Sequence, residues 1–195
     1  MKTKFQITVA IFALFLVITS CKGKEKEGET NNSNTNNEKV IKKEIVDDPF
    51  FYVTLKAKFS KWDKLHMYYL SEQSDKYSGE RKTEKEVIPN GDFQEIKFEL
   101  KEQVYPYNIR LDFGINKEQT QVLIEECVLH YGNETFKIKG KDLNKYFHFN
   151  KGIEVNPDSL TFTLQTFKRG KDDIYDPFIR GNQELNNVVR IYLFF

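Results

Sequence analysis

The chain has 195 residues and a formal net charge of +1, from 30 lysines and arginines against 29 aspartates and glutamates. This near-neutral balance, with no basic patch interleaved with aromatic residues, argues against nucleic acid as a partner. The 17 phenylalanines and 10 tyrosines favour β structure with a well-filled core. The length suits one ordinary domain with a short additional segment.

The first 20 residues have the three parts of a secretory signal. Lys2 and Lys4 are followed by an apolar run over 5–18 and then by the small residues Thr19 and Ser20. A run of about 14 residues is too short to span a hydrocarbon core of roughly 30 Å comfortably. We therefore expect residues 1–20 to be a cleaved signal peptide.

The four residues Ile18-Thr19-Ser20-Cys21 resemble a bacterial lipobox. This resemblance implies diacylglycerol on the Cys21 sulfur, cleavage before Cys21 and acylation of the new amino group, including palmitate-type chains. Two or more acyl chains hold a protein stably on a bilayer. The alternative is an ordinary signal peptide with a chance cysteine at this position. Lipidation of Cys21 would leave Cys127 unpaired, and we expect Cys127 to be a buried, inert thiol.

Residues 21–44 predict a disordered polar tether. The segment starts with alternating charges over 22–27, and residues 31–37 contain no apolar side chain. Such a segment buries too little surface to offset the entropy of ordering it. A charged stretch directly after a lipidated cysteine also resembles surface-export signals of Bacteroidetes-type lipoproteins. That resemblance implies a lipid-anchored protein of the bacterial cell envelope, at the outer membrane.

Residues 45–195 predict one β domain, because apolar and polar residues alternate with period two in many short segments. The expected strands cover 51–59, 65–70, 96–100, 107–114, 122–131, 135–139, 160–164 and 188–195. Residues 141–145 predict a single helical turn, and Asn90-Gly91 indicates a tight turn. The pattern is typical of an all-β, antiparallel β-sandwich, jelly-roll-like, with a β-barrel as the alternative.

Three segments carry a further resemblance: Tyr68-Tyr69, the strand 109–112, and the aromatic element 146–150. Their order resembles that in carbohydrate-binding modules and galactose-binding-like β-sandwich domains. The resemblance covers about half of the chain and implies a glycan ligand.

Aromatic side chains supply the first candidate ligand-binding residues. Trp62, the only tryptophan, lies in a predicted turn, where its ring could stack on the C–H face of a sugar. Tyr52 and Tyr68 fall on the polar side of their strands and could extend this platform. The alternative is that Trp62 folds back over one end of the core, and that the tyrosines are ordinary solvent-facing residues.

Charged residues supply the others. Arg110 and Asp112 share one face of a strand and could bind hydroxyl groups, or could form an exposed salt bridge worth under about 1 kcal/mol. Asp172, Asp173 and Asp176 cluster in a predicted loop and could hold a structural calcium ion, which prefers hard oxygen ligands. The alternative for these three is a solvated acidic loop, and no other cofactor is expected.

No catalytic motif is present, and we expect a protein that is not an enzyme. His66, His130 and His148 lack metal-ligand spacing. Glu125 and Glu126 would point to opposite faces of their strand, so they cannot flank one glycosidic bond. The sequence thus predicts a membrane-anchored binding domain, with glycan as the favoured ligand. The alternatives are a protein–protein adhesion or envelope-assembly subunit, and a purely structural lipoprotein.

Overall fold

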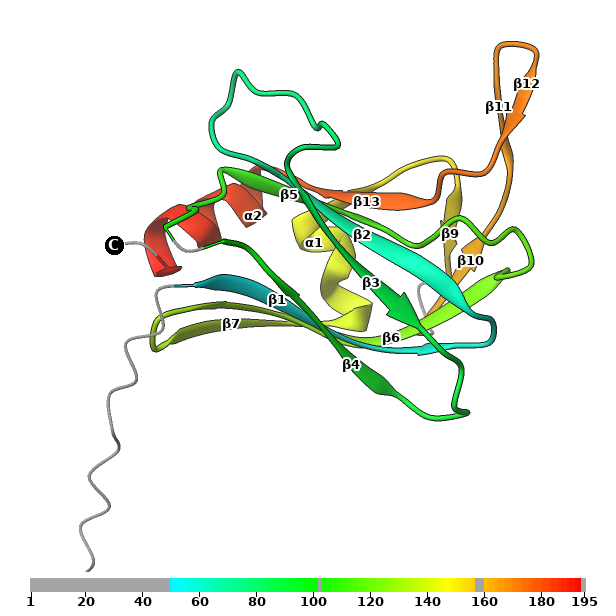
Figure 1. Cartoon of the computed structure of the whole chain (residues 1–195), viewed down its shortest axis with the longest axis horizontal. Helices are drawn as coiled ribbons and strands as arrows, with labels where there is room; N and C mark the ends of the chain where they lie inside the picture. The colour runs from blue at the N-terminus through cyan, green and yellow to red at the C-terminus, as the bar shows by residue number, and fades with distance from the viewer. Residues whose placement is uncertain (1–49, 102, 157–159, 194–195) are drawn as a thin grey trace, which may run out of the picture. The chain divides into compact units, whose positions relative to one another are not determined.

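The computed structural model describes residues 50–101, 103–156 and 160–193, which form an antiparallel β-sandwich (Figure 1). The predicted all-β sandwich is therefore confirmed. The predicted signal peptide and tether, together with Cys21, lie outside the described residues. In the part of the chain that is described, no helix is both long and apolar enough to cross a membrane.

The first sheet has β1 near its centre, hydrogen bonded to β4 on one side and to β6 on the other. The long strand β6 pairs with β10 through its first residues and with β7 through Glu126–Tyr131. The strands of this sheet are β4 (Gln94–Glu99), β1 (Phe51–Phe59), β6 (Gln121–Tyr131), β7 (Glu134–Lys139), β10 (Thr161–Leu164) and β9 (Ile153–Val155).

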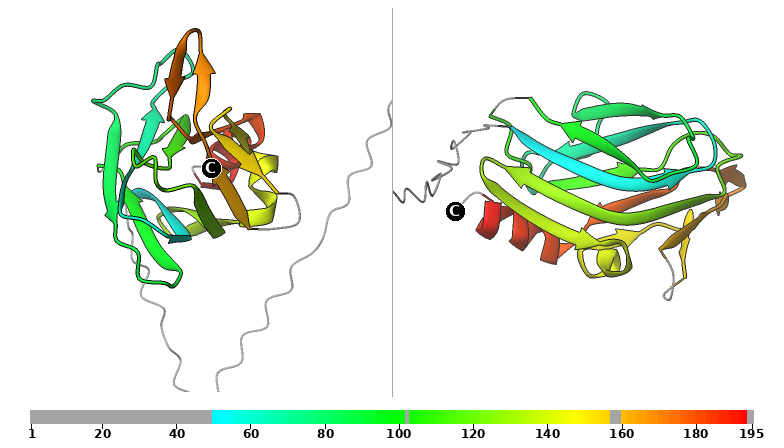
Figure 2. Two further views of the ribbon diagram at one scale, coloured as in Figure 1. Left: turned by 90° about the vertical axis from the view of Figure 1, so that its right-hand side faces the viewer. Right: turned by 90° about the horizontal axis from the view of Figure 1, so that it is seen from below.

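The second sheet has five strands, and each lies beside its neighbour in antiparallel register. In order, they are β3 (Lys82–Val87), β2 (Asp63–Leu70), β5 (Asn108–Asp112), β13 (Phe178–Gly181) and β8 (Phe147–Phe149). A separate hairpin, β11 (Phe167–Arg169) with β12 (Asp172–Ile174), projects away from both sheets (Figure 2).

One hydrophobic core fills the space between the two sheets. Strand β1 shows the reason most simply, since Phe51, Val53 and Leu55 are buried while the residues between them are half-buried. Cys127 on β6 is also fully buried, as predicted, and burial raises the pKa of its thiol to about 12. Among the described strands, the hydrogen bonding does not run from one sheet into the other, which favours the sandwich over the barrel.

The end of the chain differs from the prediction, because residues 188–193 are helical and not a strand. Helix α2 (Gln183–Val188) continues into the π-helical turn η2 (Val189–Leu193). The side chain of Asn182 caps α2 by accepting the backbone N–H groups of Glu184 and Leu185. The apolar side of this helical segment is buried, so packing against the core determines its conformation.

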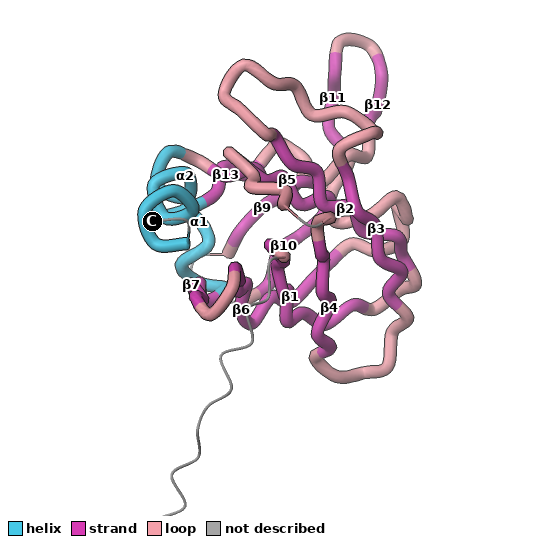
Figure 3. Tube along the Cα trace, turned by 60° about the vertical axis from the view of Figure 1, so that its left-hand side comes forward, coloured by secondary structure: helices cyan, strands magenta, loops and turns pink. Residues whose placement is uncertain are grey.

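The predicted helical turn near 141–145 is confirmed as η1 (Gly140–Asp142) followed by α1 (Leu143–Tyr146). The helices lie together at one edge of the sandwich, beside β7 and β13 (Figure 3). Gly140 lies directly against β6, and a Cβ atom there would come within 1.9 Å of the Ile124 carbonyl oxygen. Only glycine therefore fits where the chain leaves β7 for the helices.

Candidate functional site

The outward face of the second sheet brings together three of the predicted site residues. Tyr68 on β2 is paired with Arg110 on β5, and Arg110 is paired in turn with Arg180 on β13. Arg180 is paired with His148 on β8, so one row of side chains crosses four strands. Asp112 lies in the next row, opposite Phe178.

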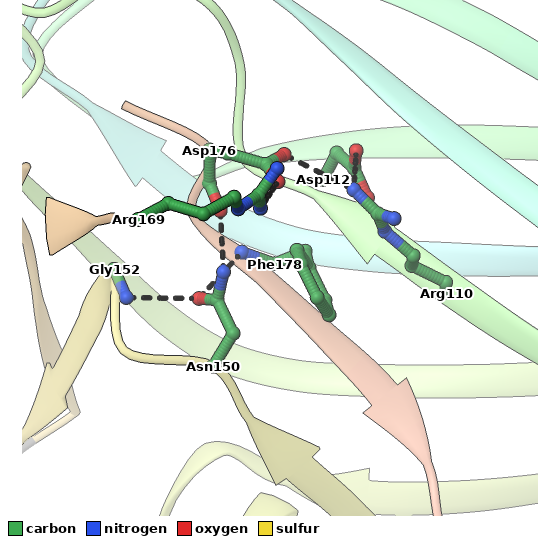
Figure 4. A network of polar contacts seen from close by, with 7 residues as sticks. All are labelled: Arg110, Asp112, Asn150, Gly152, Arg169, Asp176 and Phe178. Atoms are coloured by element: carbon green, nitrogen blue, oxygen red, sulfur yellow. Dashed lines mark hydrogen bonds and ion pairs between the residues drawn. The ribbon is translucent and has the colours of Figure 1, made fainter. Parts of the chain in front are cut away.

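Arg110 is held by two carboxylates and two aromatic rings. Its Nε and one terminal nitrogen donate to the two oxygens of Asp112, both at 2.7 Å, and the terminal nitrogen also donates to Asp176 at 3.1 Å (Figure 4). The guanidinium carbon lies 3.7 Å from the centre of the Phe178 ring and 5.4 Å from that of Tyr68. Arg110 is therefore neutralised and fixed in place by its neighbours.

Burial dominates the electrostatics of Asp112. Its side chain is only 12% exposed, and burial raises its pKa to about 6 against the opposing effect of Arg110. The Arg110–Asp112 pair is therefore more enclosed than the exposed salt bridge that was the predicted alternative. Because Nε and one terminal nitrogen of Arg110 are bonded to carboxylates, the Arg110–Asp112 pair acts as an internal support of the sheet face.

Asn150 fixes the second carboxylate of this cluster. Its side-chain oxygen accepts the backbone N–H groups of Gly152 at 3.1 Å and Phe178 at 3.2 Å (Figure 4). Its side-chain nitrogen donates to the Asp176 carbonyl oxygen. The turn between β8 and β9 is thereby tied to the start of β13, where Asp176 receives Arg110 and Arg169.

The three aspartates predicted to bind calcium do not converge. Asp173 pairs with Lys168 across the β11–β12 hairpin at 2.8 Å, and Asp176 faces Arg110 and Arg169. Positive partners compete directly with a cation for these oxygens. No group of three or more potential metal ligands is found among residues 50–101, 103–156 and 160–193.

Tyr52 and Trp62 lie apart from the Tyr68–Arg110 row. Tyr52 is on the other sheet, where its ring stacks on His130 at 4.2 Å and lies 3.9 Å from the Lys97 amine. Trp62 precedes β2 and is 46% exposed. At about 3.3 Å per strand residue, Trp62 is roughly 25 Å from Leu70 at the other end of β2. The predicted aromatic platform is thus divided among three places.

The end of β2 opens instead into a polar groove with a volume of about 680 Å³. Its lining residues come from the end of β2, the β2–β3 loop, the start of β5, β8, and the corner between β13 and α2. Its lining includes Asp75, Lys76, Tyr77, Tyr107, Asn108, His148, Arg180, Gln183 and Asn186. We call this hollow the polar groove.

Asn108 and Asn186 form its rigid floor. The Asn108 side-chain nitrogen donates to the Gly181 carbonyl oxygen at 2.9 Å and to the Asn186 side-chain oxygen at 2.7 Å. Both asparagines are buried, at 7% and 6% exposure. Gly181 must stay a glycine, because a Cβ atom there would lie 2.5 Å from the Asn108 oxygen.

Tyr77 attaches the β2–β3 loop to this floor. Its hydroxyl donates to the Asn108 side-chain oxygen at 3.1 Å. Burial raises the pKa of Tyr77, while Arg180 and Arg110 oppose the rise, so the hydroxyl stays protonated and remains a donor. Within the same loop, Asp75 pairs with Arg81 at 2.6 Å and accepts the backbone N–H of Ser71 at 2.9 Å. The wall of the groove is therefore preorganised.

Sequence reasoning missed most of the groove residues. Tyr77 lies in a segment that reads only as a polar loop, although a lone aromatic residue there indicates a side chain that folds back. Asn108 shares the outward side of β5 with Arg110, and its contacts with Tyr77, Gly181 and Asn186 bury it, which strand alternation alone cannot reveal. Asn186 lies in α2, just before the segment 188–195 that was predicted to be a strand.

Comparison of the chain with protein-family models, curated proteins and solved structures found no match.

Proposed function

We propose that the protein is a lipid-anchored envelope lipoprotein whose β-sandwich binds a glycan in the polar groove. The observation that carries the proposal is a preorganised hollow of about 680 Å³, of a size typical for small-ligand sites, lined by carboxamides and tyrosines. The Asn108 carboxamide is committed to the floor, whereas the Gln73 carboxamide also lines the groove and carries donors and an acceptor that match the mixed character of sugar hydroxyls. Tyr77 and Tyr107 add aromatic surface for the apolar faces of sugar rings.

Preorganisation supports binding because it lowers the entropy lost when a ligand is held. The Asn108 network and the Asp75–Arg81 pair already fix the floor and the wall. The groove also holds the exposed side chains of His148 and Gln183, and the Gln183 amide nitrogen donates to Asn187 while the residue lines the groove. Binding, rather than catalysis, is the role that this set of side chains supports.

The test is a glycan array followed by titration calorimetry on the best ligand. The double substitution His148→Ala and Gln183→Ala changes exposed groove residues and should weaken binding at least about tenfold, equivalent to about 1.4 kcal/mol. Trp62→Ala is the matched control, and we expect it to leave affinity unchanged. Absence of retained glycan, or a loss of binding caused by Trp62→Ala alone, would overturn the proposal.

The anchor is tested separately. Cys21→Ala should move the protein from the membrane fraction to the soluble fraction, because the acyl chains would have no attachment point. Unchanged pelleting with membranes would contradict the lipoprotein part of the proposal and leave the groove unaffected.

An exposed apolar tip favours a second candidate function, docking to an envelope protein. Trp62, Ile88 and Ile115 are 46%, 69% and 62% exposed. Asp63 holds them at the same end of the sandwich: it accepts the Ile115 N–H at 2.7 Å and pairs in register with Val87. A photocrosslinker at Ile115 should then capture an envelope protein that the same crosslinker at His148 does not capture, and equal labelling from both positions would refute this candidate.

A further inference from the structure

The polar groove has an excess of positive side chains, and this excess indicates the kind of ligand that it would bind. Among the described residues, four titratable side chains line it besides Tyr77 and Tyr107: Asp75, Lys76, His148 and Arg180. The only carboxylate, Asp75, is occupied by Arg81 at 2.6 Å and by two backbone N–H groups. The negative charge in the lining is therefore already compensated within the protein.

The positive charges have no such compensation. Arg180 is exposed and, among the described residues, makes no ion pair, and the same holds for Lys76. The neighbour of Arg180 in the row, Arg110, forms ion pairs with Asp112 and Asp176. Asp176 also forms an ion pair with Arg169. The two carboxylates on this part of the sheet are thus already committed to other arginines.

The location of Arg180 places its uncompensated charge in the groove. Arg180 and Tyr77 both line the groove, and the positive charge of Arg180 opposes the rise that burial causes in the pKa of Tyr77. On the strand side, Arg180 is paired with His148, which is exposed and also lines the groove. A planar guanidinium with free N–H donors matches carboxylate, sulfate or phosphate oxygens in a bidentate arrangement.

We infer that the polar groove selects an acidic glycan, with Arg180 binding the anionic substituent of one sugar unit and Lys76 adding to the local positive potential. The inference rests on the proposed glycan-binding function and names the ligand class within it. The carboxamides and tyrosines bind hydroxyls and ring faces, while Arg180 distinguishes an acidic sugar from a neutral one.

The experiment compares three oligosaccharide probes of equal length by calorimetry and by NMR of the groove amides: oligogalacturonate, sulfated dextran oligomers and neutral dextran oligomers. At least one acidic probe should bind about tenfold more tightly than the neutral one, because charge-assisted hydrogen bonds exceed neutral ones in strength. Arg180→Gln should remove this preference, and Arg180→Lys should restore part of it by returning the charge without the fork.

Two controls separate the groove from general attraction of polyanions. Lys171→Gln removes one positive charge from the β11–β12 hairpin, where the residue is exposed, and should leave all affinities unchanged. A single-stranded oligonucleotide should bind more weakly than the acidic glycan. An equal loss with Lys171→Gln, or equal binding of the oligonucleotide, would overturn the inference.

The results also separate this inference from the function on which it rests. If the neutral probe binds in the groove as tightly as the acidic probes, and Arg180→Gln has no effect, glycan binding stands and the charge selection is wrong. If no probe perturbs the groove amides, both fail. Urea denaturation of Arg180→Gln checks the fold, and we expect no change because Arg180 is exposed.

Discussion

Removing the Asn108 side chain should destabilise the protein more than any other single carboxamide substitution in the groove. Asn108→Ala deletes three hydrogen bonds, to Gly181, Asn186 and Tyr77. A typical bond contributes about 1 kcal/mol net, and a buried group left without a partner costs about 1–3 kcal/mol. Because the Asn186 oxygen would be left buried, we expect the free energy of unfolding to fall by roughly 3–4 kcal/mol.

Urea denaturation followed by far-ultraviolet circular dichroism measures this loss. Tyr77→Phe deletes one of the three bonds and should cost about 1 kcal/mol. The control Asn187→Ala removes a carboxamide from α2, the helix that carries Asn186. Among the described residues, the Asn187 side chain bonds to Gln183, and its loss should cost less than about 1 kcal/mol. Asn108→Ala and Asn186→Ala together should cost less than the sum of the single changes, since they share one bond. An Asn108→Ala loss no larger than that of Asn187→Ala would refute the reasoning.

Three other outcomes follow from steric fit, burial and charge. Gly140→Ala should cost at least about 2 kcal/mol by urea denaturation, because its Cβ would overlap a backbone oxygen, whereas Gly79→Ala meets open space and should be neutral; equal effects would contradict the packing. Cys127 should resist a thiol reagent at pH 8 until urea unfolds the protein, since burial raises its pKa to about 12, and rapid labelling of the folded protein would disprove this. The Asp112 carboxyl should titrate near pH 6 by NMR, and Arg110→Met should raise its pKa further, because Arg110 opposes the effect of burial. The folded pKa of Asp112 lies above the ordinary 3.8, so its contribution to stability is present below about pH 4 and is lost as the pH rises through 6. An unchanged Asp112 pKa in the Arg110 variant would argue against this assignment.

The strands were predictable from sequence because burial on one face leaves a local trace. Residues 51–59 and 122–131 alternate between apolar and polar, and both form strands of the first sheet. The same reasoning placed Arg110 and Asp112 on one face correctly. Strand alternation could not show that Asp176, 66 residues after Arg110, pairs with it, because no local sequence pattern encodes this contact.

The last segment was predicted wrongly because local composition and tertiary packing disagree. Val188, Val189 and Ile191 favour a strand by propensity. The helical signal was nevertheless present in Asn182 as a cap and in apolar residues spaced for one helix face, beginning at Leu185. Packing of that face against the core outweighs a propensity difference of a fraction of a kcal/mol per residue.

The polar groove was not predictable as a site because its parts come from segments that are far apart in the sequence. Tyr77, Asn108, Arg180 and Asn186 lie on a loop, two strands and a helix. Trp62, the only tryptophan, was predicted to bind the ligand, yet it lies at the opposite end of β2 from the groove. Composition identifies residues capable of binding a ligand, whereas the fold decides which of them meet.

The pairing of β1 has a mechanical consequence for the proposed anchoring. A pull transmitted through the preceding residues reaches the sandwich at Phe51, along the axis of β1. This strand has six paired residues on β4 and nine on β6. A load along β1 must therefore shear both ladders together, because neither neighbour can be peeled away one residue at a time. Under the proposed anchoring and ligand binding, tension would cross the core from β1 to the second sheet, and the domain would resist extension most strongly along β1.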